Sequence, residues 1–181
     1  MQWCEKVGTE PYLCLNFGTG TLDEGELGFY SSIFSVTNPN CIPALGWVEY
    51  CNGTSDTYYA NLRRKNGRQE PYNVKYWALG NEVYGDWQVC QMAKEDYAKK
   101  AYQWAKALKL LDPSLKLILC GFNGLSSWDS YVIKECVRND LHGLGGNNTT
   151  ASLIDMHSIH LYTASSDHLQ NVTGLSPCPC W

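Results

Sequence analysis

The feature that most constrains the fold is the spacing of four short apolar segments along the 181-residue chain. They begin at residues 11, 74, 115 and 154, and turn-forming residues bound each of them. Mostly apolar runs of this length are typical of parallel strands that are covered on both faces. The sequence therefore predicts four buried strands, at residues 11–17, 74–80, 115–121 and 154–162.

Helical patterns fill the intervals between these segments. Apolar side chains recur every 3.6 residues over residues 97–111 and predict a helix that Asp112-Pro113 ends. A second helix is predicted over residues 128–137, with Ser127 as its N-cap. Five lysines lie off the apolar stripe of the first helix: Lys94, Lys99, Lys100, Lys106 and Lys109. The alternation of strands and helices predicts an α/β protein with a parallel sheet.

The lengths of the repeating units indicate which α/β architecture this is. The strand starts are 63, 41 and 39 residues apart. Units of about 40 residues suggest a (β/α)₈ barrel, of which four units would form a part. A doubly wound sheet also fits, but residues 16–21 lack the third glycine of a nucleotide-binding loop. The long first interval contains residues 25–43, which we interpret as an insertion into a helix, with an active-site loop as the alternative.

Composition and charge exclude several kinds of partner. Lys+Arg 14 against Asp+Glu 18 gives a net charge of −4, so no basic surface for nucleic acid is expected. No apolar run reaches the roughly 18–20 residues of a membrane span. Nine irregularly spaced cysteines without a Cys-x-x-Cys motif predict that most of them are buried thiols rather than parts of a disulfide framework or a metal site. Seven tryptophans and 12 tyrosines suit stacking on sugar rings, or else partly wet core positions.

Residues that can carry chemistry end the second and the fourth predicted strand. Asn81 can fix a sugar hydroxyl, and Glu82 can pass a proton to a glycosidic oxygen. The alternative is that both residues only cap a following helix. Strand alternation puts His160 and Tyr162 on one face, so we expect them at the same mouth as Glu82. For His160, the alternative is a hydrogen-bonded core histidine.

Five segments carry a likeness to a known family: residues 9–24, 47–53, 61–67, 70–82 and 155–163. They resemble glycoside hydrolase family 51, the α-L-arabinofuranosidases, and especially its fungal members. Many retaining glycosidases share Gly-Asn-Glu, but the run from Glu70 to Glu82 that ends in this motif is specific. The likeness covers about residues 1–24 and 44–173.

The resemblance implies a fold and an activity. The fold is a (β/α)₈ catalytic barrel joined to a β-sandwich. The activity is retaining hydrolysis of terminal non-reducing α-L-arabinofuranosyl residues in arabinan- or arabinoxylan-type polysaccharides, through two glutamates and with no cofactor or metal. Glu82 matches the acid/base and Asn81 its substrate-binding neighbour. His160 and Tyr162 match active-site positions, and Tyr162 is expected to orient the second glutamate. Family members are often homo-oligomers.

The resemblance also implies that this chain is partial. The nucleophilic glutamate is expected on a later strand, the family sequence begins upstream of Met1, and residues 174–181 resemble nothing in the family. We therefore expect a partial barrel over residues 1–173 with the insertion 25–43, then a non-family tail, and no sandwich. Such a chain is expected to be inactive alone. A non-catalytic sugar-binding fragment and a non-functional gene-model product are the alternatives.

The cellular location stays open at this point. The first residues show no export signal, because charged side chains stand where a signal peptide has its apolar run. Cysteines that look reduced favour the cell interior. Four glycosylation sequons, which begin at Asn52, Asn147, Asn148 and Asn171, shift the expectation slightly towards secretion.

Overall fold

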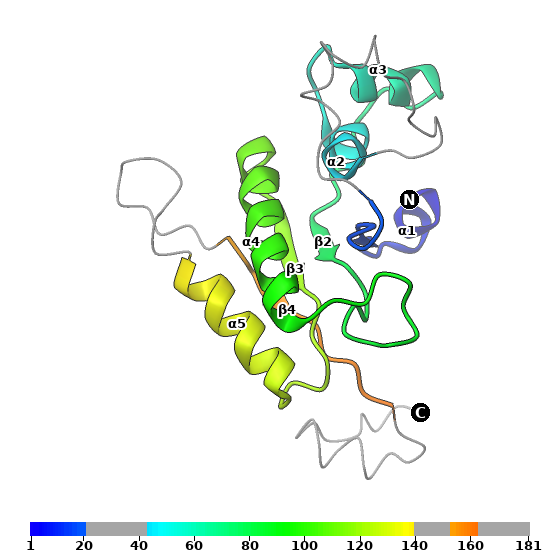
Figure 1. The fold of residues 1–181 in the computed structure, drawn as a ribbon. Helices are drawn as coiled ribbons and strands as arrows, with labels where there is room; N and C mark the ends of the chain where they lie inside the picture. The colour runs from blue at the N-terminus through cyan, green and yellow to red at the C-terminus, as the bar shows by residue number, and fades with distance from the viewer. Residues whose placement is uncertain (21–42, 140–152, 163–181) are drawn as a thin grey trace.

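One parallel sheet of four strands, in the order β1-β2-β3-β4, forms the centre of the molecule (Figure 1). The structure is a computed structural model, and it describes residues 1–20, 43–139 and 153–162. Each strand pairs with the next one along the chain, as in a barrel of successive βα units. The predicted α/β class and parallel sheet are confirmed. The strands are β1 (Tyr12–Cys14), β2 (Tyr76–Leu79), β3 (Lys116–Leu119) and β4 (Met156–His157).

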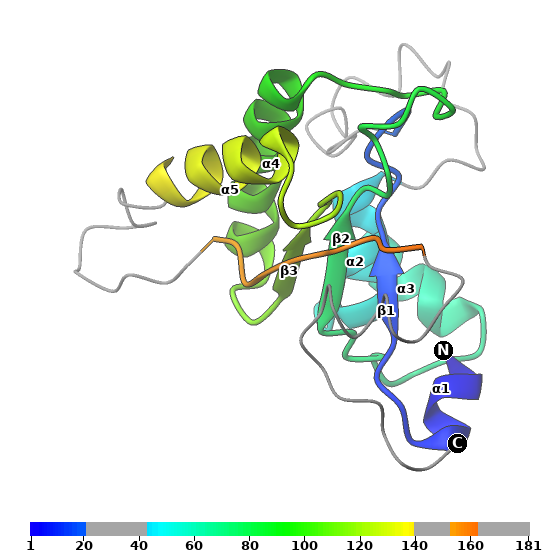
Figure 2. The ribbon, with the colours of Figure 1, turned by 90° about the horizontal axis from the view of Figure 1, so that it is seen from below.

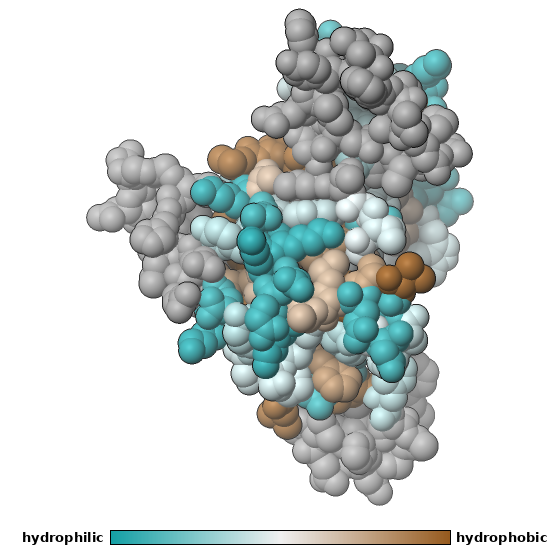
Figure 3. Space-filling model, in the orientation of Figure 1, coloured by the Kyte–Doolittle hydropathy of each residue, from teal (hydrophilic) through white to brown (hydrophobic). Residues whose placement is uncertain are grey.

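Helices accompany the sheet in two groups. Within the described ranges they are α1 (Gln2–Val7), α2 (Ala44–Asn52), α3 (Tyr58–Lys65), α4 (Lys94–Leu111) and α5 (Ser127–Asn139). Helix α2 packs against α3, α4 packs against α5, and α2 also contacts α4. In Figure 2, α4 and α5 lie side by side near β3, while α2 and α3 lie near β1 and β2. Hydrophilic residues gather over the outward side of α4 (Figure 3).

The hydrophobic core lies between the strands and these helices. Strands β2 and β3 supply fully buried side chains, among them Trp77 and Leu117. Trp47 of α2 meets Trp77 edge-on, with ring centroids 5.7 Å apart. The apolar stripe predicted for α4 is buried except at its end, where Leu111 is 46% exposed. Its buried members are Tyr97, Ala101, Trp104, Ala105 and Leu108.

Tyr97 joins the C-terminal ends of β2 and β3. Its hydroxyl donates to Leu79 O at 2.8 Å and accepts a hydrogen bond from the Cys120 amide at 2.7 Å. Trp128 of α5 donates its Nε1–H to Cys120 O at 2.9 Å. The outer helices therefore fix the strand ends at the edge of the sheet where barrel enzymes carry their active site.

Two details of the predicted helices are wrong. The N-cap of α5 is Ser126 rather than Ser127, because Ser126 Oγ accepts from the Asp129 amide at 3.2 Å and the Ser126 amide donates to Asp129 Oδ2 at 3.1 Å. Lys109, predicted to lie off the buried stripe of α4, is only 9% exposed. Its Nζ donates to Leu115 O at 2.5 Å and to Asp155 Oδ2 at 2.9 Å, which satisfies the buried charge.

Some predictions fall on residues outside the described ranges. The insertion at residues 25–43 is described only at Pro43, the N-cap of α2, and the tail 174–181 is not described, so both stay predictions. The sequence does not predict helix α3, because only Ala60 and Arg63 are buried on it, too few to form an apolar stripe. Among the described helices, none has the length and hydropathy that crossing a membrane requires.

Candidate active site

A sharp turn after β2 projects the Glu82 carboxylate from the sheet. Gly80 has a φ of 89°, and a Cβ there would lie 2.9 Å from Phe17 Cβ. Glu82 itself has a φ of 49°, a left-handed conformation that costs about 1–2 kcal/mol for a residue with a side chain. Backbone strain of this kind clusters at functional sites. The next helix begins only at Lys94, so the alternative that Asn81 and Glu82 cap a helix is wrong.

Three side chains bind the Glu82 carboxylate. His160 Nδ1 lies 2.9 Å from Oε1, and the Tyr162 hydroxyl donates to the same oxygen at 3.0 Å. The Trp87 Nε1–H donates to the other oxygen, Oε2, at 3.3 Å. The structure therefore brings Glu82, His160 and Tyr162 into contact, although the two partners come from the segment after β4 and the carboxylate from the turn after β2.

Asn81 lies next to this network without joining it. The residue is exposed, and its side-chain amide makes no hydrogen bond to any other residue of the described ranges. The amide is consequently open to a ligand that approaches from solvent. In the same described ranges, no group of three or more His, Cys, Asp or Glu side chains could hold a metal ion.

The hydrogen bonds set the protonation of the site. The bond from His160 lowers the pKa of the Glu82 carboxyl; burial opposes this, and the bonds from Tyr162 and Trp87 lower the pKa further. The bond to Glu82 raises the pKa of the Tyr162 hydroxyl. Burial, followed by the charge of Glu82, raises the pKa of Tyr84 well above its ordinary value. At neutral pH Glu82 is therefore a carboxylate, and both phenols keep their protons.

Aromatic rings stand beside the carboxylate. The Tyr84 ring lies 6.1 Å from the Trp87 ring, 4.6 Å from Phe122 and 6.4 Å from His160, measured between ring centroids. Trp87 is 64% exposed and Phe122 is 39% exposed, so both offer flat apolar faces to solvent. Tyr84, Trp87 and Gln88 closely follow Glu82 in the sequence, which predicts aromatic and polar groups beside the carboxylate. The hydrogen bond from Trp87 to Glu82 Oε2 was not predicted.

Fold and site together define a class of protein. A parallel sheet of βα units with a carboxylate at the C-terminal end of a strand is the arrangement of a (β/α)₈-barrel glycoside hydrolase. The family described as the α-L-arabinofuranosidase 1 domain matches residues 1–175. The chain belongs to this family, the α-L-arabinofuranosidases of glycoside hydrolase family 51.

Individual relatives agree with this assignment and are longer than the chain. Probable α-L-arabinofuranosidase C of Aspergillus fumigatus is 65% identical over 174 residues, which are 96% of this chain and 30% of that protein. Intracellular exo-α-(1→5)-L-arabinofuranosidase 1 of Bacillus subtilis is 30% identical over 96% of this chain and 34% of its own length. The arabinose complex of the Thermotoga maritima α-L-arabinofuranosidase is 40% identical, with a TM-score of 0.68, over 93% of this chain and 28% of that one. The chain thus spans about a third of the length of these relatives.

Proposed function

We propose that a protein containing this chain is a retaining α-L-arabinofuranosidase, which releases terminal non-reducing α-L-arabinofuranosyl residues from arabinan- or arabinoxylan-type polysaccharides. The observation that carries this proposal is the Glu82 carboxylate, held by His160 and Tyr162 at the C-terminal end of β2. Membership of the family supports the choice of substrate.

The proposed mechanism assigns roles to Glu82, Asn81 and Trp87. Glu82 protonates the glycosidic oxygen of the leaving group while a second carboxylate, which the described residues do not supply, attacks the anomeric carbon and forms the glycosyl-enzyme intermediate. Glu82 later takes a proton from the water that displaces this carboxylate. Asn81 donates to a hydroxyl of the arabinofuranosyl ring through its open amide. Trp87 offers its exposed indole face to the sugar on the leaving-group side.

We propose further that the 181-residue chain does not hydrolyse substrate by itself. Retaining hydrolysis needs two carboxyl groups about 5–5.5 Å apart. Among the described residues, Glu82 is the one carboxylate that His160 and Tyr162 bind. The lowered pKa of Glu82 also keeps it ionised, whereas a general acid has to carry a proton. A second carboxylate nearby would raise that pKa.

The first experiment tests the chain alone. Purified residues 1–181 and the Glu82→Gln variant are assayed on 4-nitrophenyl α-L-arabinofuranoside. We expect both to release nitrophenol at the same background rate. Turnover that the substitution abolishes would contradict the inactivity of the chain and would support the role of Glu82.

A second experiment tests the proposed activity. Residues 1–175 replace the matching segment of the Aspergillus fumigatus relative, and the chimera is assayed with and without Glu82→Gln. We expect the chimera to release arabinose and the substitution to lower kcat by about 10²–10⁴-fold, the usual contribution of general acid–base catalysis. A chimera that keeps its full activity after Glu82→Gln would overturn the assignment.

Carbohydrate binding without turnover is a second candidate function. The exposed Trp87 indole and the open Asn81 amide favour it. Titration of the chain with arabino-oligosaccharides, followed by tryptophan fluorescence, tests for binding that Trp87→Ala abolishes. Trp3→Ala is the matched control, because Trp3 is 69% exposed on α1. Equal losses in both variants would refute binding at this site.

A further inference from the structure

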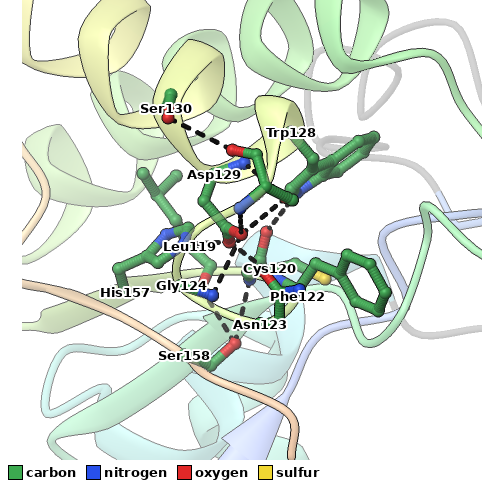
Figure 4. Close-up of polar contacts among 12 residues, drawn as sticks. Leu119, Cys120, Phe122, Asn123, Gly124, Trp128, Asp129, Ser130, His157 and Ser158 are labelled. Atoms are coloured by element: carbon green, nitrogen blue, oxygen red, sulfur yellow. Dashed lines mark hydrogen bonds and ion pairs between the residues drawn. The ribbon is translucent and has the colours of Figure 1, made fainter. Parts of the chain in front are cut away.

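A second polar cluster lies where the loop after β3 meets β4 (Figure 4). Its centre is the Asp129 carboxylate of α5, which is 1% exposed. Oδ1 accepts a hydrogen bond from the Phe122 amide at 2.7 Å and lies 2.7 Å from His157 Nε2. Oδ2 accepts from the Gly124 amide at 3.0 Å and from the Ser126 amide and hydroxyl at 3.1 and 2.6 Å. One carboxylate thereby binds the loop after β3 and the strand β4.

The protonation of this cluster follows from its contacts. Burial by itself raises the pKa of Asp129, but the bonds from Ser126, His157 and the amides outweigh it and lower the pKa to about 2. An ionised carboxylate only accepts, so the His157 Nε2–H must donate to it. Within the described ranges His157 Nδ1 is buried without a partner, which suits an unprotonated nitrogen better than an N–H group.

The cluster is connected to the candidate active site through Phe122. The Phe122 amide donates to Asp129, and the Phe122 carbonyl oxygen accepts a hydrogen bond from the His160 amide at 2.6 Å. His160 in turn places Nδ1 at 2.9 Å from Glu82 Oε1. A single loop residue therefore separates the Asp129 carboxylate from the histidine that binds Glu82.

Ser158 provides a second connection between the same two parts of the chain. Its amide donates to Leu119 O at 2.9 Å, and its hydroxyl accepts from the Gly121 amide at 3.0 Å. Ser158 Oγ also lies 3.4 Å from His160 Nε2. The segment that follows β4 is consequently held to the loop after β3 at two points, residues 158 and 160.

We propose that Asp129 is a positioning residue for the acid/base. Its bonds to the loop after β3 and to His157 hold the segment after β4 so that His160 and Tyr162 meet Glu82. The catalytic part of this inference rests on the proposed function, but its test needs no turnover. A failure of the chimera assay would therefore refute the proposed function and leave the positioning result standing.

The test measures the pKa of Glu82 in the full 181-residue chain by the pH dependence of its carboxyl ¹³C shift, assigned with Glu82→Gln. Because the bond from His160 is the main cause of the lowered pKa, His160→Ala is the reference variant and should raise the Glu82 pKa. We expect Asp129→Asn to raise the Glu82 pKa by about as much as His160→Ala does. A Glu82 pKa that is the same in Asp129→Asn and in the unchanged chain would overturn the proposal.

A matched control separates a positioning effect of Asp129 from a general loss of stability of the fold. Asp155 is a partly buried carboxylate, and it binds Lys109, Lys116 and the Leu117 amide at the opposite end of β3 and β4. Asp155→Asn should destabilise the chain but leave the Glu82 pKa unchanged. If Asp155→Asn raises the Glu82 pKa as much as Asp129→Asn does, a general loss of stability explains the effect and the proposal is refuted.

Variants of His157 keep the test decisive if Asp129→Asn does not fold. His157→Gln retains an N–H group near the position of Nε2 and should preserve the Glu82 pKa, whereas His157→Ala should raise it. Hydrogen exchange of the His160 amide should also become faster in His157→Ala. The Leu15 amide, which donates to Ala78 O at 2.9 Å across β1 and β2, serves as the internal reference. Unchanged exchange of the His160 amide relative to Leu15 would contradict the proposal.

Discussion

At the scale of single residues, Gly80 determines the turn that carries Glu82. Gly67 has a similar positive φ of 94°, but a Cβ added there would have no atom within 4 Å, so it serves as the control. We expect Gly67→Ala to lower the free energy of unfolding by about 1–2 kcal/mol through its φ alone. Gly80→Ala should cost about 1–3 kcal/mol more, because its Cβ also presses on Phe17. Urea unfolding of the two variants measures the difference, and equal losses would contradict this account.

The Asp129 carboxylate gives the chain a defined acid sensitivity. Its pKa is about 2 in the folded state against an ordinary value of 3.8, so its bonds stabilise the fold above about pH 4 and are lost as the pH falls towards 2. We expect the stability of Asp129→Asn to change less between pH 4 and pH 2 than that of the unchanged chain. Urea unfolding at several pH values measures this, and parallel pH curves for the two proteins would refute it.

At the scale of elements, the start of α5 depends on one serine. Ser126→Ala removes the hydroxyl that accepts from the Asp129 amide and donates to the Asp129 carboxylate, and should lower the free energy of unfolding by about 1–3 kcal/mol. Ser127→Ala alters a residue one position further on, whose side chain is not the cap, and should stay within about 0.5 kcal/mol. Thermal or urea unfolding compares the two. A larger effect at Ser127 would show that Ser127 is the N-cap, as the sequence predicted.

The elements also show what the sequence could and could not predict. The meeting of Glu82 with His160 and Tyr162 was predictable, because the C-terminal ends of parallel strands share one edge of a sheet. The burial of Lys109 was not, since its partner Asp155 lies 46 residues away and no local pattern joins them. The contact of His157 with Asp129 depends on the path of a loop, and loop paths do not follow from hydrophobic periodicity.

At the scale of the whole molecule, the sheet of the described ranges has two edge strands, β1 and β4, which each pair on one side only. Apolar side chains are exposed on β4 and directly after it, Met156 at 45% and Ile159 at 58%. Unpaired edges of this kind promote self-association. We expect the purified chain to associate with increasing concentration, and Ile159→Lys to weaken that association, as measured by light scattering after gel filtration.

Leu110→Lys is the control for this prediction, because Leu110 is 67% exposed and belongs to helix α4 rather than to an edge strand. It should leave the association unchanged. A chain that stays monomeric at all concentrations would contradict the prediction, and so would equal effects of the two lysine substitutions.

The buried hydroxyl of Tyr97 links the two strand ends that flank the candidate active site. It stands between a carbonyl of β2 and the amide that follows β3, so these two groups meet through an oxygen that belongs to α4. The spacing between the C-terminal ends of β2 and β3 is therefore set in part by a side chain of α4, which lies outside the sheet. Substitutions along α4 would therefore alter this spacing while Glu82 and its partners His160 and Tyr162 remained the same.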